Sequence, residues 1–178
     1  MRKLAFQTAA VLALVSSAQL HAAQVQQAQS CMTRPELRGL VAYFLPTVLQ
    51  SAIDTCSQRL APESYLVGRA PRLLGTLEAG RPEAWPMAKQ AFVKMGGEGD
   101  KSSAELFASL PEAAVRPLIE AVIVQKIGSS IKPESCGDID RVMAPLEPLP
   151  ATNLVEVLTE AMAIAGRNDK QLRVCKEA

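Results

Sequence analysis

Ser129 and Lys132 stand in a Ser-x-x-Lys spacing, in which a lysine can activate a serine as a nucleophile. A site of this kind also needs a Ser-x-Asn and a Lys-Thr-Gly element, and the sequence contains neither. A lysine near the carboxyl end of a helix is in any case favoured by the helix dipole. We therefore interpret this pair as a polar helix end without a catalytic role.

Asp138 and Asp140, with Glu134 nearby, could supply the two carboxyl groups that glycoside hydrolysis needs roughly 5–10 Å apart. Side chains at helical positions i and i+2, however, point about 200° away from each other. Acidic residues in a first helical turn are also stabilised by the helix dipole. We prefer this structural explanation and keep a carboxylate-dependent cell-wall hydrolase as an alternative function.

A glycine-rich loop contains four oxygen-bearing side chains, those of Glu98, Asp100, Ser102 and Glu105, which suggests calcium. An EF-hand loop places oxygen ligands at alternating positions and ends in a bidentate glutamate, and this spacing does not reproduce it. The sequence also lacks a glycine-rich phosphate loop followed by lysine and serine or threonine. We predict no metal site and no cofactor.

The first 22 residues have the features of a secretory signal peptide, which is removed from the mature protein. Arg2 and Lys3 precede an apolar stretch, and small residues lead to Ala22. We predict a signal peptide over 1–22, a polar tail over 23–33, and a periplasmic or secreted location.

Cleavage at this point removes His21, the only histidine in the chain. Histidine is the usual general base and the commonest zinc ligand. The four cysteines all lie in the exported part, where disulfide formation would remove their thiols as nucleophiles. We therefore predict that the mature protein is not an enzyme.

The charge of the mature chain limits its partners. Loss of Arg2 and Lys3 leaves 17 of the 19 Lys and Arg residues against 18 Asp and Glu, a formal charge of −1. Nucleic-acid binding needs a basic excess, so we predict no nucleic-acid partner. The longest unbroken apolar run in the most apolar segment covers 121–124, far short of the roughly 20 residues that a bilayer requires. We predict no stable membrane insertion after signal cleavage.

Four cysteines in an oxidising compartment predict two disulfides, for which three pairings exist. We prefer Cys31 with Cys56 and Cys136 with Cys175, because each pair flanks an expected helical hairpin. The first pair requires a turn at Pro46. If Pro46 only bends one long helix, the 25 positions between these cysteines span about 37 Å, and this bond cannot form.

Apolar residues recur at helical spacing through most of the mature chain, without a long strand pattern. The segment Pro111–Lys132 is apolar on most of its helical circumference. A helix of this kind must be covered on more than one side, so we predict that it is the buried central helix of a bundle.

Local signals place the other helices. Thr33 and Glu36 form a capping-box pattern, 80–82 is an expected break, and Trp85 is predicted to be buried. The last helix is expected from about Thr152. The last two helices are predicted to turn the following apolar residues inward: Ile139, Val142, Met143, Leu146, Leu154, Val157, Leu158, Ala161, Ile164 and Ala165.

Together these patterns predict an all-α fold, a single compact bundle of about six to eight helices over 34–178, stabilised by two disulfides. The expected function is binding of another envelope protein, as an inhibitor or immunity-type protein would do. A carrier of a small apolar molecule or lipid is an alternative. A continuous apolar cavity of several hundred Å³ would favour the carrier, whereas a filled core would oppose it.

Overall fold

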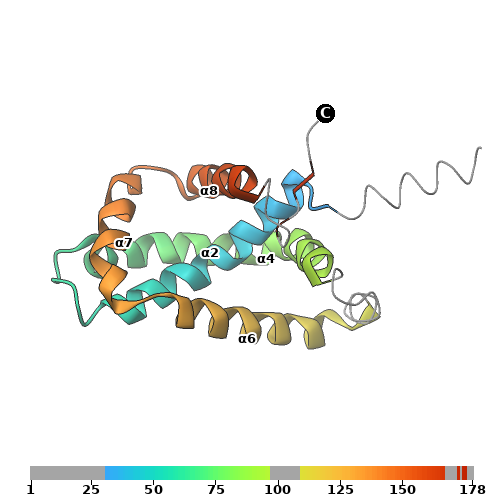
Figure 1. Cartoon of the computed structure of the whole chain (residues 1–178), viewed down its shortest axis with the longest axis horizontal. Coiled ribbons are helices and arrows are strands. Elements are labelled where there is room, and N and C mark those ends of the chain that lie inside the picture. The colour runs from blue at the N-terminus through green and yellow to red at the C-terminus, as the bar shows by residue number, and fades with distance from the viewer. Residues whose placement is uncertain (1–30, 97–108, 167–171, 173, 176–178) are drawn as a thin grey trace, which may run out of the picture. The chain divides into compact units, whose positions relative to one another are not determined.

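The computed structural model describes residues 31–96, 109–166, 172, 174 and 175, and its helices are shown in Figure 1. The described residues contain no named strand and the following helices: α2 (Arg34–Cys56), α3 (Tyr65–Gly68), α4 (Ala70–Gly96), α6 (Glu112–Ser130), α7 (Cys136–Met143) and α8 (Ala151–Ala165), with two 3-10 turns, η1 (Pro133–Ser135) and η2 (Ala144–Leu146). The predicted all-α fold is confirmed. The predicted signal peptide over 1–22, most of the tail over 23–33 and the loop of Glu98, Asp100, Ser102 and Glu105 lie outside the described residues.

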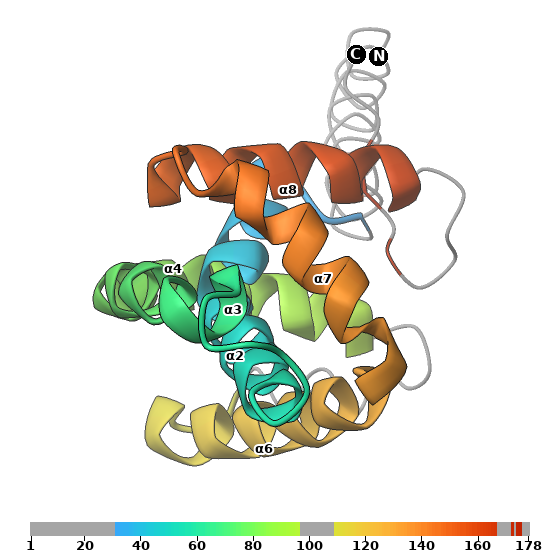
Figure 2. The same ribbon diagram turned by 90° about the vertical axis from the view of Figure 1, so that its left-hand side faces the viewer.

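α2 is the central helix, with α8 on one side of it and α6 on the opposite side (Figure 2). Thr33 caps its start, and the predicted capping box with Glu36 is present. Its buried side chains contribute to both hydrophobic clusters of the bundle, with Leu37 and Tyr43 in one and Leu49 in the other. The other helices therefore pack around α2.

The turn at Pro46 that the preferred disulfide pairing requires is absent, and the break predicted at 80–82 is wrong. Pro46 lies inside α2 and is fully buried. α4 likewise runs through 80–82 and contains Pro82 and Pro86. A proline inside a helix removes one backbone hydrogen bond, but burial of these two helices against each other outweighs the local preference. Trp85 on α4 is 3% exposed, which confirms its predicted place in the core.

Cys56 at the end of α2 is bonded to Cys136 at the start of α7, with Cα atoms 5.4 Å apart. Cys31 and Cys175 are also disulfide-bonded, which confirms the prediction of two disulfides. The preferred pairing of Cys31 with Cys56 and Cys136 with Cys175 is wrong. Since α2 is one helix of 23 residues, its two ends lie about 35 Å apart.

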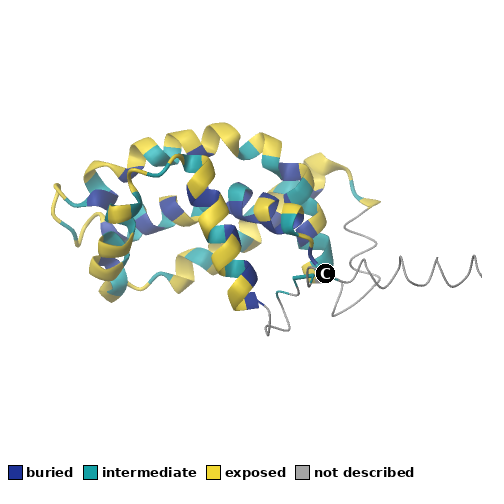
Figure 3. Ribbon diagram, turned by 90° about the horizontal axis from the view of Figure 1, so that it is seen from above, coloured by how far each residue is buried: buried dark blue, intermediate teal, exposed yellow. Residues whose placement is uncertain are grey.

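The prediction of the inward residues of the last two helices is correct in part. Ile139, Met143 and Leu158 pack against the core as predicted. Val142, Val157 and Ile164 were expected inside and are 63%, 49% and 60% exposed. Leu154 is buried as predicted, and α8 otherwise turns inward the residues Val155, Thr159 and Ala163. Buried residues gather on the inward sides of the helices, as Figure 3 shows.

The described C-terminal residues lie beside the start of α2. Met32 and Val174 form a parallel bridge, and the Cys175 N–H donates to the Met32 carbonyl at 2.9 Å. None of the helices in the described ranges has the length and apolar character needed to cross a bilayer.

Candidate binding sites

Three of the residues that suggested catalysis make structural contacts, whereas Lys132 and Glu134 are exposed. The Asp140 carboxylate accepts a hydrogen bond from the Leu66 backbone N–H at 2.8 Å, whereas Asp138 pairs with Arg141 at 3.1 Å. Ser129 donates to the Lys126 carbonyl at 3.0 Å. These contacts join helices or close helix ends, and they do not assemble an acid–base pair. Within the described ranges, no group of three or more His, Cys, Asp or Glu side chains could hold a metal ion.

α6 faces the bundle with both apolar and charged residues. Val115 and Ile119 are its two buried side chains. Between them, Arg116 Nε donates to the Tyr43 hydroxyl at 2.7 Å, and that hydroxyl donates to the Glu120 carboxylate. The charged residues in the middle of α6 are therefore directed inward, toward the central helix.

Arg81 of α4 completes this polar network. Its guanidinium lies 3.2 Å from Glu120 and 4.7 Å from the centroid of the Tyr43 ring. Arg116 lies 5.2 Å from the centroid of the Trp85 ring. Cation–π contacts and charge-assisted hydrogen bonds of this kind join three helices without broad apolar burial.

Burial is the main reason why the pKa of the Tyr43 phenol lies above its ordinary value of 10.0. The hydrogen bond from Arg116 lowers this pKa, and the Glu120 carboxylate raises it. Because the phenol keeps its proton at neutral pH, it can accept from Arg116 while it donates to Glu120. Tyr43 thus links two oppositely charged residues of α6 to α2.

The outward face of α6 consists of Ala114, Leu118, Ala121, Val122, Val124 and Gln125, all exposed. These six residues carry no charge, and the exposed charged residues of α6 are Glu112 and Lys126. Leu118, Val122 and Val124 are 54%, 57% and 49% exposed. An exposed helix normally turns its polar residues outward, so the middle of α6, where Arg116 and Glu120 face the bundle, has the reverse arrangement. The prediction that Pro111–Lys132 is the buried central helix is therefore wrong, although its apolar character is real. Contiguous exposed apolar surface of this kind marks interaction sites.

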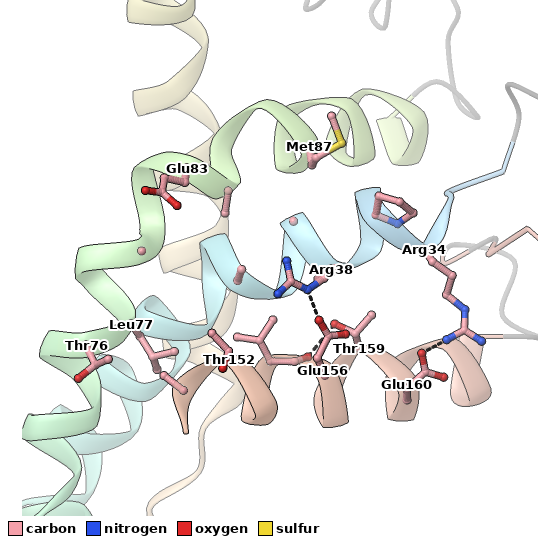
Figure 4. Close-up of a pocket in the computed structure, with 17 residues that line it drawn as sticks. Arg34, Arg38, Thr76, Leu77, Glu83, Met87, Thr152, Glu156, Thr159 and Glu160 are labelled. Carbon is pink, nitrogen blue, oxygen red and sulfur yellow. Dashed lines mark hydrogen bonds and ion pairs between the residues drawn. The ribbon is translucent and has the colours of Figure 1, made fainter. Parts of the chain in front are cut away.

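A second candidate site is a cleft of about 700 Å³ between α2, α4 and α8, shown in Figure 4. We call it the α2–α4–α8 cleft. It is lined by Arg34, Pro35, Arg38, Gly39, Ala42, Thr76, Leu77, Gly80, Glu83, Ala84, Met87, Ala151, Thr152, Val155, Glu156, Thr159 and Glu160. The volume lies within the range of roughly 300–1,000 Å³ that is usual for small-molecule sites.

Two ion pairs join α2 to α8 along this cleft. Arg34 pairs with Glu160 and Arg38 with Glu156, as the dashed lines in Figure 4 show. Leu77 and Val155 are buried, apolar parts of the lining. The cleft thus combines apolar contact surface with charged groups at a solvent-accessible opening, a composition that suits an amphipathic molecule.

Sequence reasoning identified neither binding surface. The cleft could not be inferred from local spacing, because the ion-pair partners of Glu156 and Glu160 lie 118 and 126 residues away. One signal for α6 was available, since Arg116 and Glu120 stand four residues apart and so share one face of the helix. That spacing could have shown that the charged residues of α6 lie on one face of the helix and that the apolar residues Leu118 and Val122 lie on another.

Comparison with known proteins adds no identity to these sites: no family model, curated protein or solved structure matches the chain.

Proposed function

We propose that the protein is an exported, non-catalytic binding protein that recognises another protein of the cell envelope through the outward face of α6. The observation that carries this proposal is the reversed polarity of α6, in which Arg116 and Glu120 face the bundle and Leu118 and Val122 face solvent. Exposed apolar side chains at i and i+4 on one helix are the usual anchors of helix-in-groove recognition.

The chemistry of this face favours a protein over a lipid surface. Helices that lie on membranes carry many Lys and Arg residues on their polar side, next to the apolar face. In α6, the two basic residues are Arg116, which is engaged by Tyr43 and Glu120, and Lys126, which is exposed, so the helix lacks the many basic residues of a membrane-surface helix. An apolar groove on a partner protein would cover the outward face without leaving buried charges unpaired. An inhibitor or immunity-type protein would act in this way.

The test is affinity capture from envelope extract with the tagged full chain and two variants. Leu118→Arg combined with Val122→Arg places two charges on the outward face of α6. Val142→Arg on α7 is the control, because Val142 is also exposed, at 63%, and lies on another helix. We expect wild type and the control to capture the same saturable partner, and the double variant to lose at least about tenfold in affinity. Equal capture by all three proteins would contradict the proposal.

A second candidate function is transport of a small amphipathic molecule in the α2–α4–α8 cleft. The observation in its favour is the volume of about 700 Å³ beside buried Leu77 and Val155. Gly80 lines this cleft and Gly75 does not, and a Cβ atom added at either glycine meets no atom within 4 Å. Gly80→Phe therefore introduces an aromatic ring at the cleft from a position where the Cβ atom meets no neighbour, and Gly75→Phe is its matched control.

Calorimetric titration with dodecanol, a neutral single-chain amphiphile, measures this function directly. Wild type and Gly75→Phe should bind it with equal affinity, and Gly80→Phe should bind it at least about tenfold more weakly, because the ring occupies the space that the chain needs. Absence of binding to wild type, or equal binding by Gly80→Phe, would remove this candidate.

A further inference from the structure

The charged groups of the α2–α4–α8 cleft are not all neutralised. Arg34 and Arg38 each face a carboxylate of α8, those of Glu160 and Glu156. Glu83 on the α4 wall has no ion pair or hydrogen bond among the described residues. The lining therefore has two guanidinium groups and three carboxylates, a formal charge of −1.

This arrangement distinguishes between possible ligand head groups. An anionic head group would approach an arginine that already pairs with Glu156 or Glu160, and it would meet the negative charge of that carboxylate at close range. A cationic head group meets no such repulsion, because the Glu83 carboxylate can accept it directly. Figure 4 shows Glu83 on α4, while the side chains of Arg34 and Arg38 extend toward α8.

We infer that the ligand of the α2–α4–α8 cleft is a cationic amphiphile, with an ammonium group that pairs with Glu83 and an apolar part that packs on Leu77 and Val155. This inference rests on the second candidate function given above. Apolar burial supplies most of the affinity. Because Glu83 is exposed, its ion pair adds only a modest preference, roughly two- to fivefold.

The experiment compares three probes with the same apolar chain at low ionic strength, dodecylamine, dodecanol and dodecanoate, each below the concentration at which it forms micelles or separates from solution. The proteins are wild type, Glu83→Gln, Glu63→Gln and Gly80→Phe. Glu63 is exposed and does not line the cleft, so Glu63→Gln controls for the change in net charge. Calorimetry gives the dissociation constant for each combination.

The expected order for wild type and Glu63→Gln is dodecylamine tightest, dodecanol roughly two- to fivefold weaker, and dodecanoate weakest. Glu83→Gln should bind dodecylamine and dodecanol equally, and Gly80→Phe should weaken all three. Tighter binding of dodecanoate than of dodecylamine, or a preference for the amine that survives in Glu83→Gln, would overturn the inference. Binding of dodecanol with no preference for the amine would overturn it while leaving the carrier function intact, whereas failure of all three probes removes both.

Discussion

The burial of α2 and α6 is the reverse of what their sequences predict. α2 contains an internal proline, a glycine and several charged residues, yet it is buried on several sides. α6 is apolar on most of its circumference by sequence, yet it lies at the edge of the bundle, with Val115 and Ile119 as its buried residues. The comparison teaches that the apolar character of a helix indicates how much covering surface it needs. It does not indicate whether that surface belongs to the same chain.

The two helices also differ in how they are held. α2 shares apolar side chains with both clusters of the core and is bonded to α7 through Cys56. α6 is held by two buried apolar residues and by the network of Tyr43, Arg116 and Glu120. We therefore expect substitutions along α2 to lower the free energy of unfolding of the whole domain. Substitutions around α6 should mainly change how firmly that helix is attached.

The largest effect is expected from loss of the Cys56–Cys136 disulfide. The bond joins positions 80 residues apart, and its removal should lower the free energy of unfolding by about 4 kcal/mol, because the unfolded chain regains the freedom of a long loop. The measurement is chemical unfolding of the double Cys56→Ser and Cys136→Ser variant. A loss below about 1 kcal/mol would mean that packing alone keeps the end of α2 in place.

Gly39 and Gly128 allow a matched comparison of the two helices. A Cβ atom at Gly39 would lie 2.3 Å from the Met87 Cβ atom, whereas one at Gly128 meets nothing within 4 Å. Gly39→Ala should therefore destabilise the protein by about 1–3 kcal/mol, since α2 and α4 must move apart. Gly128→Ala should stabilise it by about 0.5–1 kcal/mol through helix propensity. Thermal unfolding of both variants checks the signs, and destabilisation by Gly128→Ala would show that α6 is covered.

Tyr43→Phe tests the attachment of α6. The variant removes the hydroxyl that bonds to Arg116 and Glu120, at a cost of about 1–2 kcal/mol. Tyr65 is also buried, but its hydroxyl makes no hydrogen bond among the described residues, so Tyr65→Phe is the control. Hydrogen exchange should become faster in α6 than in α2 for Tyr43→Phe. Equal acceleration in both helices would contradict a local role for the network.

Glu36 tests the start of α2 at low pH. Burial raises the pKa of its carboxyl, but hydrogen bonds from Lys94 and Thr33 outweigh this effect and hold the pKa below the ordinary value of 4.5. A lowered folded-state pKa stabilises the protein above about pH 4.5, and this contribution is lost as the pH falls through the folded-state value. Glu36→Gln should cost about 1 kcal/mol at neutral pH and should reduce the loss of stability in acid. An acid unfolding profile of Glu36→Gln that is identical to that of wild type would oppose this assignment.

Local signals in the sequence were sufficient to predict the fold class, the cap at the start of α2 and the burial of Trp85. The Thr33–Glu36 capping box depends only on residues three positions apart, and buried Trp85 follows from a short helical stripe. The turn at Pro46 and the break at 80–82 are absent because tertiary burial keeps α2 and α4 continuous. A local sequence pattern carries no information about that burial. The disulfide pairing failed for the same reason, since it relied on a turn at Pro46.

The two binding surfaces could not be predicted because both depend on how distant helices pack. The α2–α4–α8 cleft requires residues of three helices, and the ion pair of Arg38 with Glu156 spans 118 positions. For α6, the apolar pattern was recognised correctly, but two arrangements satisfy it: burial inside this domain or cover by a partner. Only the position of α6 relative to α2 distinguishes between them.

Adjacent substitutions on α6 test the central claim most directly. Leu118 is 54% exposed and Ile119 is 2% exposed, so urea unfolding of Leu118→Asp and Ile119→Asp compares the outward and inward sides of one helical turn. The account predicts that Leu118→Asp changes the free energy of unfolding by no more than about 0.5–1 kcal/mol, whereas Ile119→Asp lowers it by at least about 3 kcal/mol. Equal, large losses for the two variants would mean that the chain itself covers α6, and would contradict the proposal of an external partner.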